Sequence, residues 1–378
     1  MGFYRFDSPY DWNRVAPYKE TAKKAPGGMV DLSVGSPVDP VPASVQRALA
    51  GSTDLPNAHG YPTVAGTGTL RKAVEEWFRV NRGVDFDAIN ADFVPTVGSK
   101  EAVALMASLL HFGPGDVIVQ PEVSYPTYDI GTQLAGAKTY KAADIADVNS
   151  WRSIPGVKAI WVNSPCNPTG EVLLAAQLHD IVAAAREIGA VVLSDECYGL
   201  LTWTGENGVA PTPAPCMLQP DVCDGSAEGI LVLYSLSKQS NMAGYRTALI
   251  AGDPELVRPM TVYRKQIGEI IPGPIQAAMA VALGDSEAVK TQRARYAKRL
   301  HQLVDGLCAY GYDAHMPQGA LYVWVRAKSD DCWQDMADLA RLGIIASPGE
   351  FYGAPAYLRF SATATDTSIA EVVSRLRG

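Results

Sequence analysis

The chain has 378 residues, of which 47% are hydrophobic and 19% charged, and its formal net charge is −8 at pH 7. These values are ordinary for a globular protein, and the length predicts two domains, or one large domain with a smaller one built from the termini. A negative chain without blocks of lysine or arginine gives no electrostatic reason to expect nucleic acid or an anionic membrane as partner.

No apolar run approaches the roughly 20 residues of a membrane span, and the first residues lack the charged and apolar regions of a signal peptide. We therefore expect a cytoplasmic protein with no membrane partner. The six cysteines are scattered without a CxxC pair, which indicates neither a metal site nor a disulfide framework.

Residues 1–30 carry three prolines and a Gly-Gly pair around a short polar segment, which predicts an arm with one helix that reaches a partner subunit. A short apolar segment at 31–37 follows and contains Gly35, where the missing side chain would let a ligand approach the backbone. Helices are predicted at 44–49 and over 70–80, where the apolar residues share one helical face.

From residue 93 onward, short apolar runs alternate with helical patterns. The runs are continuous rather than alternating, which is typical of strands that are covered on both faces. They are residues 93–97, 116–119, 158–162, 190–193 and 229–234. Helices are predicted from residue 98 and over 177–188, each ended by a glycine. This order predicts an α/β fold with a mostly parallel sheet between helices.

Polar residues return where three of these runs end, in the stretches NSPCNPTG, DECY and SLSK. The carboxyl ends of parallel strands share one edge of a sheet, where ligands bind. We therefore expect the three stretches, at residues 163–170, 195–198 and 235–238, to form one site. Cys166 and Cys197 within them are interpreted as small filling residues.

Residues 205–228 are rich in proline and glycine and are predicted to be irregular. After a helix from Pro254, a Pro-Gly-Pro break precedes a long helix whose four basic residues are interpreted as a solvated face. These residues are Arg293, Arg295, Lys298 and Arg299. From about residue 302 the pattern becomes that of a smaller α+β unit. The predicted division is 1–50 for the arm and part of a small domain, 51–272 for a large domain and 273–378 for the C-terminal small domain.

Lys238 follows a predicted buried strand and has Ser235, Ser237 and Arg246 as near neighbours in the sequence. Burial and a neighbouring cation lower the pKa of a lysine, which makes its amine available to form an imine with an aldehyde. The hydroxyls and the guanidinium would then hold a phosphate. For the SxSK pattern alone, a surface lysine in a polar loop is the simpler interpretation, because short motifs often match by accident.

With Lys238 for the imine, Asp195 for a protonated ring nitrogen and Arg359 for a substrate carboxylate, the set suits pyridoxal phosphate. Taken singly, Asp195 is equally well explained as a helix cap and Asn167 as a turn residue. Tyr198 is equally well explained as a core residue, and Arg359 as half of a surface pair. Their order and spacing along the chain weaken all of these alternatives at once.

The order and spacing resemble those of the fold-type I aminotransferases of class I and II, from about Gly35 to Arg359. The matching stretches are GYPTVAGTGTLRKAV, VGSKEA, NSPCNPTG, SDECYG, SLSKQSNMAGYR, SPGEFYG and YLRFS. The resemblance implies a fold like that of aspartate aminotransferase. Such a fold has a large domain with a seven-stranded, mostly parallel sheet, and a smaller α+β domain built from both termini.

The resemblance also implies catalytic roles. Lys238 would form the Schiff base with pyridoxal phosphate and act as general acid and base. Asp195 would hold the pyridinium nitrogen, and Tyr198 and Asn167 would hold the ring oxygen. The residues expected to bind the substrate are Gly35, Asn167 and Arg359, the last through the α-carboxylate.

The remaining cofactor contacts are implied in the same way. The expected phosphate ligands are Ser235, Ser237, Arg246 and the backbone amides of Ser99 and Lys100. Amides at a helix start form a ready anion site, and arginine grips phosphate through a planar fork. Tyr125 is expected to stack on the cofactor ring. Tyr61 is expected to reach the phosphate of the neighbouring subunit's cofactor, which implies a homodimer with shared active sites.

The implied reaction moves an amino group between a small-molecule amino acid and a keto acid. The N-terminal arm and SLSKQSNMAGYR look most like N-succinyl-diaminopimelate aminotransferases of lysine biosynthesis, which use glutamate as amino donor. An aspartate or broad-specificity aminotransferase is the alternative, and a β-lyase or decarboxylase would use the same cofactor residues. A regulator that senses pyridoxal phosphate would need a DNA-binding module, for which the roughly 30 residues before Asp31 leave no room.

Overall fold

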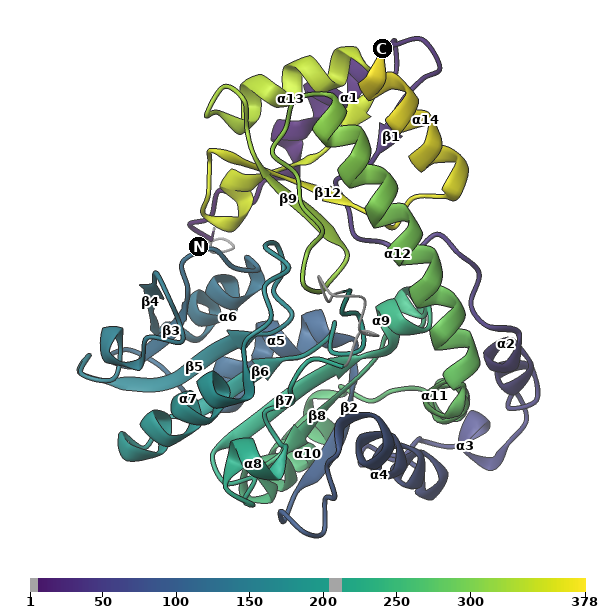
Figure 1. Cartoon of the computed structure of the whole chain (residues 1–378). Helices are drawn as coiled ribbons and strands as arrows, with labels where there is room; N and C mark the ends of the chain where they lie inside the picture. The colour runs from purple at the N-terminus through teal and green to yellow at the C-terminus, as the bar shows by residue number, and fades with distance from the viewer. Residues whose placement is uncertain (1–5, 204–212) are drawn as a thin grey trace, which may run out of the picture.

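The computed structural model describes residues 6–203 and 213–378, so part of the irregular segment predicted at 205–228 lies outside the described residues. The chain forms a large unit around a seven-stranded sheet and a smaller unit built from segments near both ends of the sequence (Figure 1). The α/β fold expected from the sequence is confirmed.

The large sheet has the strand order β2-β8-β7-β6-β5-β3-β4. Neighbouring strands are parallel except at β8, which runs antiparallel to both β2 and β7. The strands are β2 (Asp92–Val97), β3 (Val117–Pro121), β4 (Lys138–Ala142), β5 (Val157–Asn163), β6 (Val191–Asp195), β7 (Ile230–Ser235) and β8 (Thr247–Gly252). The mostly parallel sheet is confirmed, whereas β4 and β8 were not among the predicted runs.

Side chains of successive strand residues point to opposite faces, so the fully buried strand β7 supplies both cores of the sheet. Ile230 and Val232 pack on one face, while Leu231 and Leu233 pack on the other. This two-sided burial explains why the central strands appear as continuous apolar runs.

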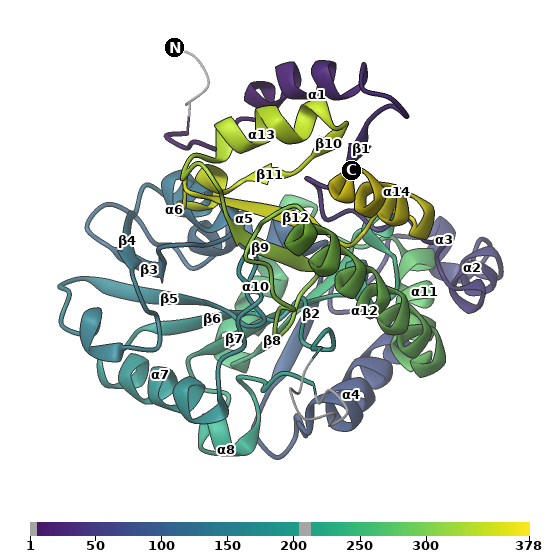
Figure 2. The same ribbon diagram turned by 45° about the horizontal axis from the view of Figure 1, so that its top comes forward.

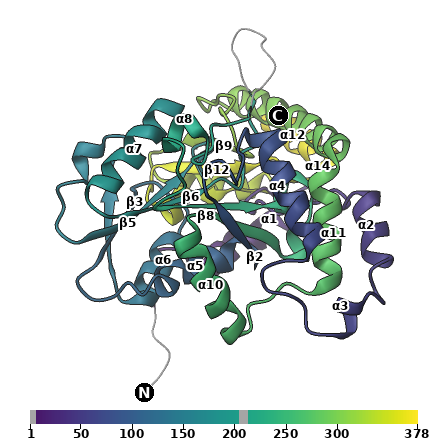
Figure 3. The ribbon, with the colours of Figure 1, turned by 90° about the horizontal axis from the view of Figure 1, so that it is seen from below.

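Helices cover both faces of the sheet, as Figure 3 shows from below. One face carries α4 (Gly68–Arg82), α7 (Ala175–Glu187), α8 (Pro220–Cys223) and α11 (Gly273–Gly284). The other carries α5 (Ser99–Leu109), α6 (Thr127–Ala135) and α10 (Pro254–Ile267). The short helices α2 (Ala43–Ala50) and α3 (Pro56–His59) lie beside α11.

Local sequence sets the ends of these helices. In α4, the Thr67 hydroxyl accepts a hydrogen bond of 3.2 Å from the backbone N–H of Leu70 and so caps the first turn. Gly83 ends the helix in the left-handed conformation, with φ of 67°. The helix predicted over 70–80 is therefore confirmed and extends two residues further at each end.

The smaller unit joins residues that are far apart in the sequence. Strand β1 (Val30–Asp31) pairs in parallel with β10 (Ile344–Ile345), and α1 (Ala16–Ala22) lies beside α13 (Cys332–Arg341) (Figure 2). A second, antiparallel sheet has the order β11-β12-β9. Its strands are β9 (Tyr322–Arg326), β11 (Ser347–Pro348) and β12 (Tyr357–Ser361), and α14 (Asp366–Arg377) follows.

Helix α12 (Ser286–Ala309) connects the two units. Its 24 residues span about 36 Å at 1.5 Å per residue. Val289, near its start, packs in the core of the large sheet, whereas Leu303 and Leu307 pack in the core of the smaller unit. The domain boundaries at residues 50 and 272 stay a prediction.

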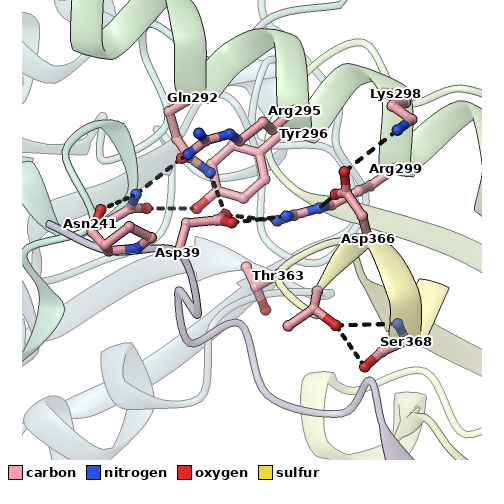
Figure 4. Close-up of polar contacts among 12 residues, drawn as sticks. Asp39, Asn241, Gln292, Arg295, Tyr296, Lys298, Arg299, Thr363, Asp366 and Ser368 are labelled. Atoms are coloured by element: carbon pink, nitrogen blue, oxygen red, sulfur yellow. Dashed lines mark hydrogen bonds and ion pairs between the residues drawn. The ribbon is translucent and has the colours of Figure 1, made fainter. Parts of the chain in front are cut away.

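The basic residues of α12 differ from the prediction of a solvated face. Arg299 is only 2% exposed, because it lies seven residues after Gln292 on the buried side of the helix. Its Nη1 and Nη2 donate to Asp39 at 2.7 and 2.8 Å, and its Nε donates to Asp366 at 2.6 Å (Figure 4). The prediction is therefore wrong for Arg299, and Arg293 is half-buried with its Nη2 donating to the carbonyl oxygen of Thr202 at 3.2 Å, while Arg295 and Lys298 are exposed.

Candidate active site

The carboxyl ends of β5, β6 and β7 border a cavity of about 310 Å³ that also reaches the smaller unit. Every predicted site residue except Tyr61 lines it. These residues are Gly35, Ser99, Lys100, Tyr125, Asn167, Asp195, Tyr198, Ser235, Ser237, Lys238, Arg246 and Arg359. The structure thus brings the three polar stretches together, and the ligand contact of each residue stays a prediction.

Lys238 lies on the short helix α9 (Leu236–Gln239) directly after β7. The helix starts there because the Ser235 hydroxyl accepts a hydrogen bond of 3.1 Å from the backbone N–H of Ser237. The lysine ammonium donates to the carbonyl oxygen of Gly35. The pKa of Lys238 is lowered to about 8, chiefly by burial and also by the nearby positive charges of Arg359 and Arg246.

Asp195 is the last residue of β6 and is buried. Its Oδ2 accepts a hydrogen bond of 2.8 Å from the Tyr128 hydroxyl, and its Oδ1 accepts one of 3.2 Å from the backbone N–H of Cys197. Burial raises the pKa of Asp195, although both hydrogen bonds lower it.

The next residue, Glu196, has a different environment. Its carboxylate is buried against Arg82 at 2.6 Å and also accepts a hydrogen bond of 2.8 Å from the backbone N–H of Met217. Among the described residues, Asp195 has no such cationic partner within 4.0 Å. A buried carboxylate without a cation suits a protonated ring nitrogen.

An anion cradle lies at the start of α5. Gly98 precedes the helix with φ of 81°, and a side chain there would overlap the guanidinium of Arg246. The hydroxyls of Ser235 and Ser237 border the same cavity. Free backbone N–H groups of a helix start, hydroxyls and a guanidinium together form a donor set suited to a phosphate.

Arg359 comes from β12 of the smaller unit and is only 5% exposed. Its Nη1 donates to Oδ1 of Asn167 at 2.6 Å, and its Nη2 donates to the carbonyl oxygen of Ser33 at 2.8 Å. Its guanidinium carbon lies 4.0 Å from the ring centroid of Tyr322 and 4.8 Å from that of Tyr352. Within the described residues it pairs with no carboxylate, so the alternative of a surface ion pair is wrong.

A side chain at Gly35 would overlap the hydroxyl of Tyr322, which is one physical reason for a glycine at this position. Gly35 also lines the cavity, and its contact with a substrate stays a prediction. Tyr61 lies outside the cavity, and its side chain is fully exposed, at 101%. Its contact with a second subunit stays a prediction.

The sequence did not single out several residues of the site. Tyr10, Trp12, Tyr322 and Tyr352 also line the cavity, together with Asn163 and Cys197 from the stretches that were expected at the site. Tyr128 lies in α6, and its hydrogen bond to Asp195 joins residues 67 positions apart, so no local pattern in the sequence indicated this contact. Cys197 is more than the predicted filler since it faces the cavity, but burial raises the pKa of its thiol well above the usual value.

Among the described residues, no helix combines the length and the apolar character that crossing a membrane requires. Histidine, cysteine and acidic side chains in 6–203 and 213–378 form no group that could hold a metal ion.

Comparison with known proteins gives a consistent result. A sequence profile of the family described as "Aminotransferase class I and II" matches residues 27–376. The chain is 40% identical over 369 residues to 4-dedimethylamino-4-oxo-anhydrotetracycline transaminase OxyQ of Streptomyces rimosus, over 97% of this chain and 98% of the relative. It is 39% identical to a probable aminotransferase of Mycobacterium tuberculosis, over 97% of this chain and 84% of the relative.

The fold is similar to that of a probable N-succinyldiaminopimelate aminotransferase from Thermus thermophilus, with a TM-score of 0.84 and 24% identity over 97% of this chain and 99% of that one. The site described above has a lysine with a lowered pKa, a buried carboxylate without a cation and an anion cradle, which is the donor set that pyridoxal phosphate requires. The chain therefore belongs to the class I and II aminotransferases, enzymes that use pyridoxal phosphate to exchange amino groups between amino acids and keto acids.

Proposed function

We propose that the enzyme takes an amino group from glutamate and transfers it to N-succinyl-2-amino-6-ketopimelate, in lysine biosynthesis. The observation that carries this proposal is the pair of cations Arg359 and Lys100 on one cavity. No carboxylate among the described residues pairs with either one. A substrate with a carboxylate at each end can engage both cations, whereas a monocarboxylate engages one.

Lys100 suits the distal carboxylate because of its place and its surroundings. Its side chain is exposed at the edge of the cavity, and its Nζ lies 5.6 Å from the ring centroid of Tyr10. Its backbone N–H belongs to the first turn of α5, the predicted phosphate cradle. The same residue can therefore serve the cofactor through its backbone and the substrate through its ammonium group.

The N-succinyl substrate is also the one for which the similar structure from Thermus thermophilus, a probable N-succinyldiaminopimelate aminotransferase, is named. An aspartate or broad-specificity aminotransferase is the first alternative, and a pyridoxal-phosphate β-lyase is a weaker one. The 40% identity to OxyQ favours a second candidate function, in which the amino acceptor is a ketone on a fused ring system. Tyr10 and Trp12 at the cavity would give such a ring an aromatic surface.

Different residues of this chain carry out separate parts of the amino-transfer reaction. When bound, pyridoxal phosphate supplies an electron sink for the electron pair left at the substrate Cα. Lys238 takes the proton from Cα, and the lowering of its pKa from 10.5 to about 8 raises the fraction of neutral amine near neutral pH. Asp195 stabilises the protonated ring nitrogen as a carboxylate. Arg359 holds the α-carboxylate, and Asn167, whose amide oxygen already accepts from Arg359, keeps its NH₂ group as a donor.

The proposal includes a homodimer with shared sites. The side chain of Tyr61 is fully exposed, and so in part is that of Leu55, a large apolar residue six positions earlier in the sequence that is 42% exposed. A partner subunit would cover both side chains and would bring Tyr61 to the phosphate of its own cofactor. This arrangement would explain why the large aromatic side chain of Tyr61 is exposed and lies outside the cavity of its own chain.

The test is a screen of amino donors and keto acceptors by the change in cofactor absorbance on amino transfer. We expect turnover with glutamate and the N-succinyl keto acid. Lys100→Met should raise the KM for glutamate about tenfold, because a charged contact is lost, and leave the KM for alanine unchanged. Lys158→Met, an exposed lysine on β5, is the matched control. Equal effects on glutamate and alanine would contradict the role of Lys100, and turnover only with cyclic ketones would favour the second candidate.

A further inference from the structure

We propose that Tyr322 is a positioning residue that couples the substrate arginine to the phenol beside the cofactor ring. The proposal rests on the proposed function for the roles of Arg359 and Tyr198. The ring of Tyr322 contacts the guanidinium of Arg359, and its hydroxyl contacts the hydroxyl of Tyr198.

The register of the smaller sheet places Tyr322 against Arg359. In the antiparallel pair β12·β9, Arg359 stands opposite Trp324, and Ser361 stands opposite Tyr322. Residues two apart on a strand share a face, so Tyr322 and Arg359 are diagonal neighbours on one face. The guanidinium carbon lies 4.0 Å from the Tyr322 ring centroid, where a desolvated cation–π contact holds the plane of the fork.

The hydroxyl of Tyr322 reaches a different partner. It lies 2.7 Å from the hydroxyl of Tyr198, and both side chains are buried. Each phenol has one proton, so only one of them donates in this bond. If Tyr198 gives its proton to the ring oxygen of the cofactor, its own oxygen must accept from Tyr322. The hydrogen-bond count therefore assigns Tyr322 as the donor.

A third contact fixes where this hydroxyl lies. A side chain at Gly35 would overlap the Tyr322 oxygen, so the backbone of the segment around Gly35 closes over it. The carbonyl oxygen of the same glycine accepts from Lys238. Tyr322 thus contacts three walls of the cavity: the strand of Arg359, the phenol of Tyr198 and the loop of Gly35.

These contacts predict two separable effects. A hydrogen bond from Tyr322 polarises the Tyr198 hydroxyl and makes it a stronger donor to the negatively charged ring oxygen. Loss of the hydroxyl alone should weaken that donor and shift the pH titration of the bound cofactor to higher pH. Loss of the ring should in addition loosen Arg359 and weaken substrate binding.

The chain offers a matched control. Tyr352 also places its ring near the Arg359 guanidinium, at 4.8 Å, but its hydroxyl lies 3.1 Å from that of Ser347 and not near Tyr198. Tyr352→Phe therefore removes a phenolic hydroxyl from the same arginine environment without touching the proposed link.

The experiment compares Tyr322→Phe, Tyr322→Leu and Tyr352→Phe as holoenzymes. We expect Tyr322→Phe to move the midpoint of the spectrophotometric pH titration, recorded without substrate, upward by about half a unit to one unit, and to change the KM for glutamate less than threefold. Tyr322→Leu should raise that KM about fivefold or more as well. Tyr352→Phe should leave the midpoint unchanged.

A Tyr322→Phe midpoint at the wild-type value would overturn the proposal, as would an equal shift in Tyr352→Phe. If Tyr322→Leu does not fold, the midpoint of the volume-matched Tyr322→Phe variant still decides the outcome. The titration needs no substrate, so it stands even if glutamate is not the donor. An error in the proposed function would instead appear as turnover with other substrates in the wild-type enzyme.

Discussion

Arg359 donates a hydrogen bond of 2.6 Å to the amide oxygen of Asn167, a residue 192 positions earlier in the sequence. The bond crosses from the smaller unit to the large sheet, because Arg359 lies on β12 and Asn167 follows β5. The residue expected at the substrate carboxylate is thus joined directly to one expected at the cofactor ring. The guanidinium has a fixed orientation before any substrate arrives, since its Nη2 is also held by Ser33.

Arg359→Lys should damage activity although it keeps the positive charge. A planar fork holds a carboxylate through two parallel hydrogen bonds, whereas an ammonium is a point charge that leaves rotation free. Loss of such a buried pair costs roughly 3–5 kcal/mol, so we expect kcat/KM for glutamate to fall about 10²- to 10⁴-fold. Cofactor affinity should stay unchanged. The matched variant Arg246→Lys should weaken the cofactor instead, and the reverse pattern would mean that the two arginines exchange roles.

The covalent capture of pyridoxal phosphate by the apoenzyme should depend on pH with a midpoint near 8. Burial lowers the pKa of Lys238 to about 8 from 10.5, and only the neutral amine attacks an aldehyde. The rate of formation of the borohydride-trapped adduct should therefore rise as the pH passes 8 and level off above it. Lys238→Ala should give no adduct. A midpoint near 10.5 would show that the ammonium is hydrated in the apoenzyme.

Asp195→Asn should keep the cofactor and lose several orders of magnitude in kcat, because a neutral amide no longer holds the ring nitrogen protonated.

The same substitution should stabilise the apoenzyme. Burial raises the pKa of Asp195, so the stability of the wild type falls as the pH rises through that value and the buried group becomes charged. The Tm of the apo variant should exceed that of the wild type at pH 7 and approach it at pH 4. If Asp195→Asn turns over at the wild-type rate, another carboxylate pairs with the ring nitrogen.

Tyr61→Phe and Lys238→Ala should be separately inactive and regain part of the activity when they are mixed and allowed to exchange subunits. In a hybrid dimer with shared sites, one of the two sites receives the intact Tyr61 and the intact Lys238. Subunit exchange is confirmed by mass or by a fluorescent label. If no activity returns although subunit exchange is confirmed, Tyr61 contributes to the active site of its own subunit.

Asp39→Asn should lower Tm and raise the KM for glutamate several-fold, because Asp39 holds the loop of Gly35 to Arg299. Burial would raise the pKa of Asp39, but hydrogen bonds from Arg299 and Gln292 outweigh it and lower that pKa. The pair should therefore stabilise the fold at neutral pH and lose its effect as the pH falls through the lowered pKa. Lys298→Met, which removes an exposed contact of 3.4 Å to Asp366, should change neither quantity.

The sequence predicted the central strands because two-sided burial makes them continuously apolar. It did not predict β4, whose residues Lys138–Ala142 are polar and partly exposed at the edge of the sheet. Strand β8 is fully buried and apolar, and its signal was present in the sequence. Its antiparallel direction between β2 and β7 was not readable, because direction depends on pairing and not on composition.

The residues of the site likewise divide into those that local sequence could place and those whose contacts depend on tertiary packing. Asp195 ends a strand, and Lys238 and Asn167 come just after strands, so the local pattern was enough to place them at one edge of the sheet. The contacts of Tyr322 with Arg359 and Tyr198 depend on the register of β9 against β12 and on the docking of the smaller unit. Arg299 was assigned to solvent since its acidic partners Asp39 and Asp366 are distant in sequence.

The long separations in the sequence have a consequence for synthesis on the ribosome. Ser33 and Arg359 are 326 residues apart, and Asp39 and Arg299 are 260 apart. At about 5–20 residues per second, the segment around Ser33 waits about 15 to 65 seconds for its partner. Meanwhile the central strands of the large sheet can already pair. Val30 and Leu32, which are buried in the finished protein, therefore stay exposed on the nascent chain during that time, and we expect them to favour aggregation or chaperone binding until the smaller unit forms.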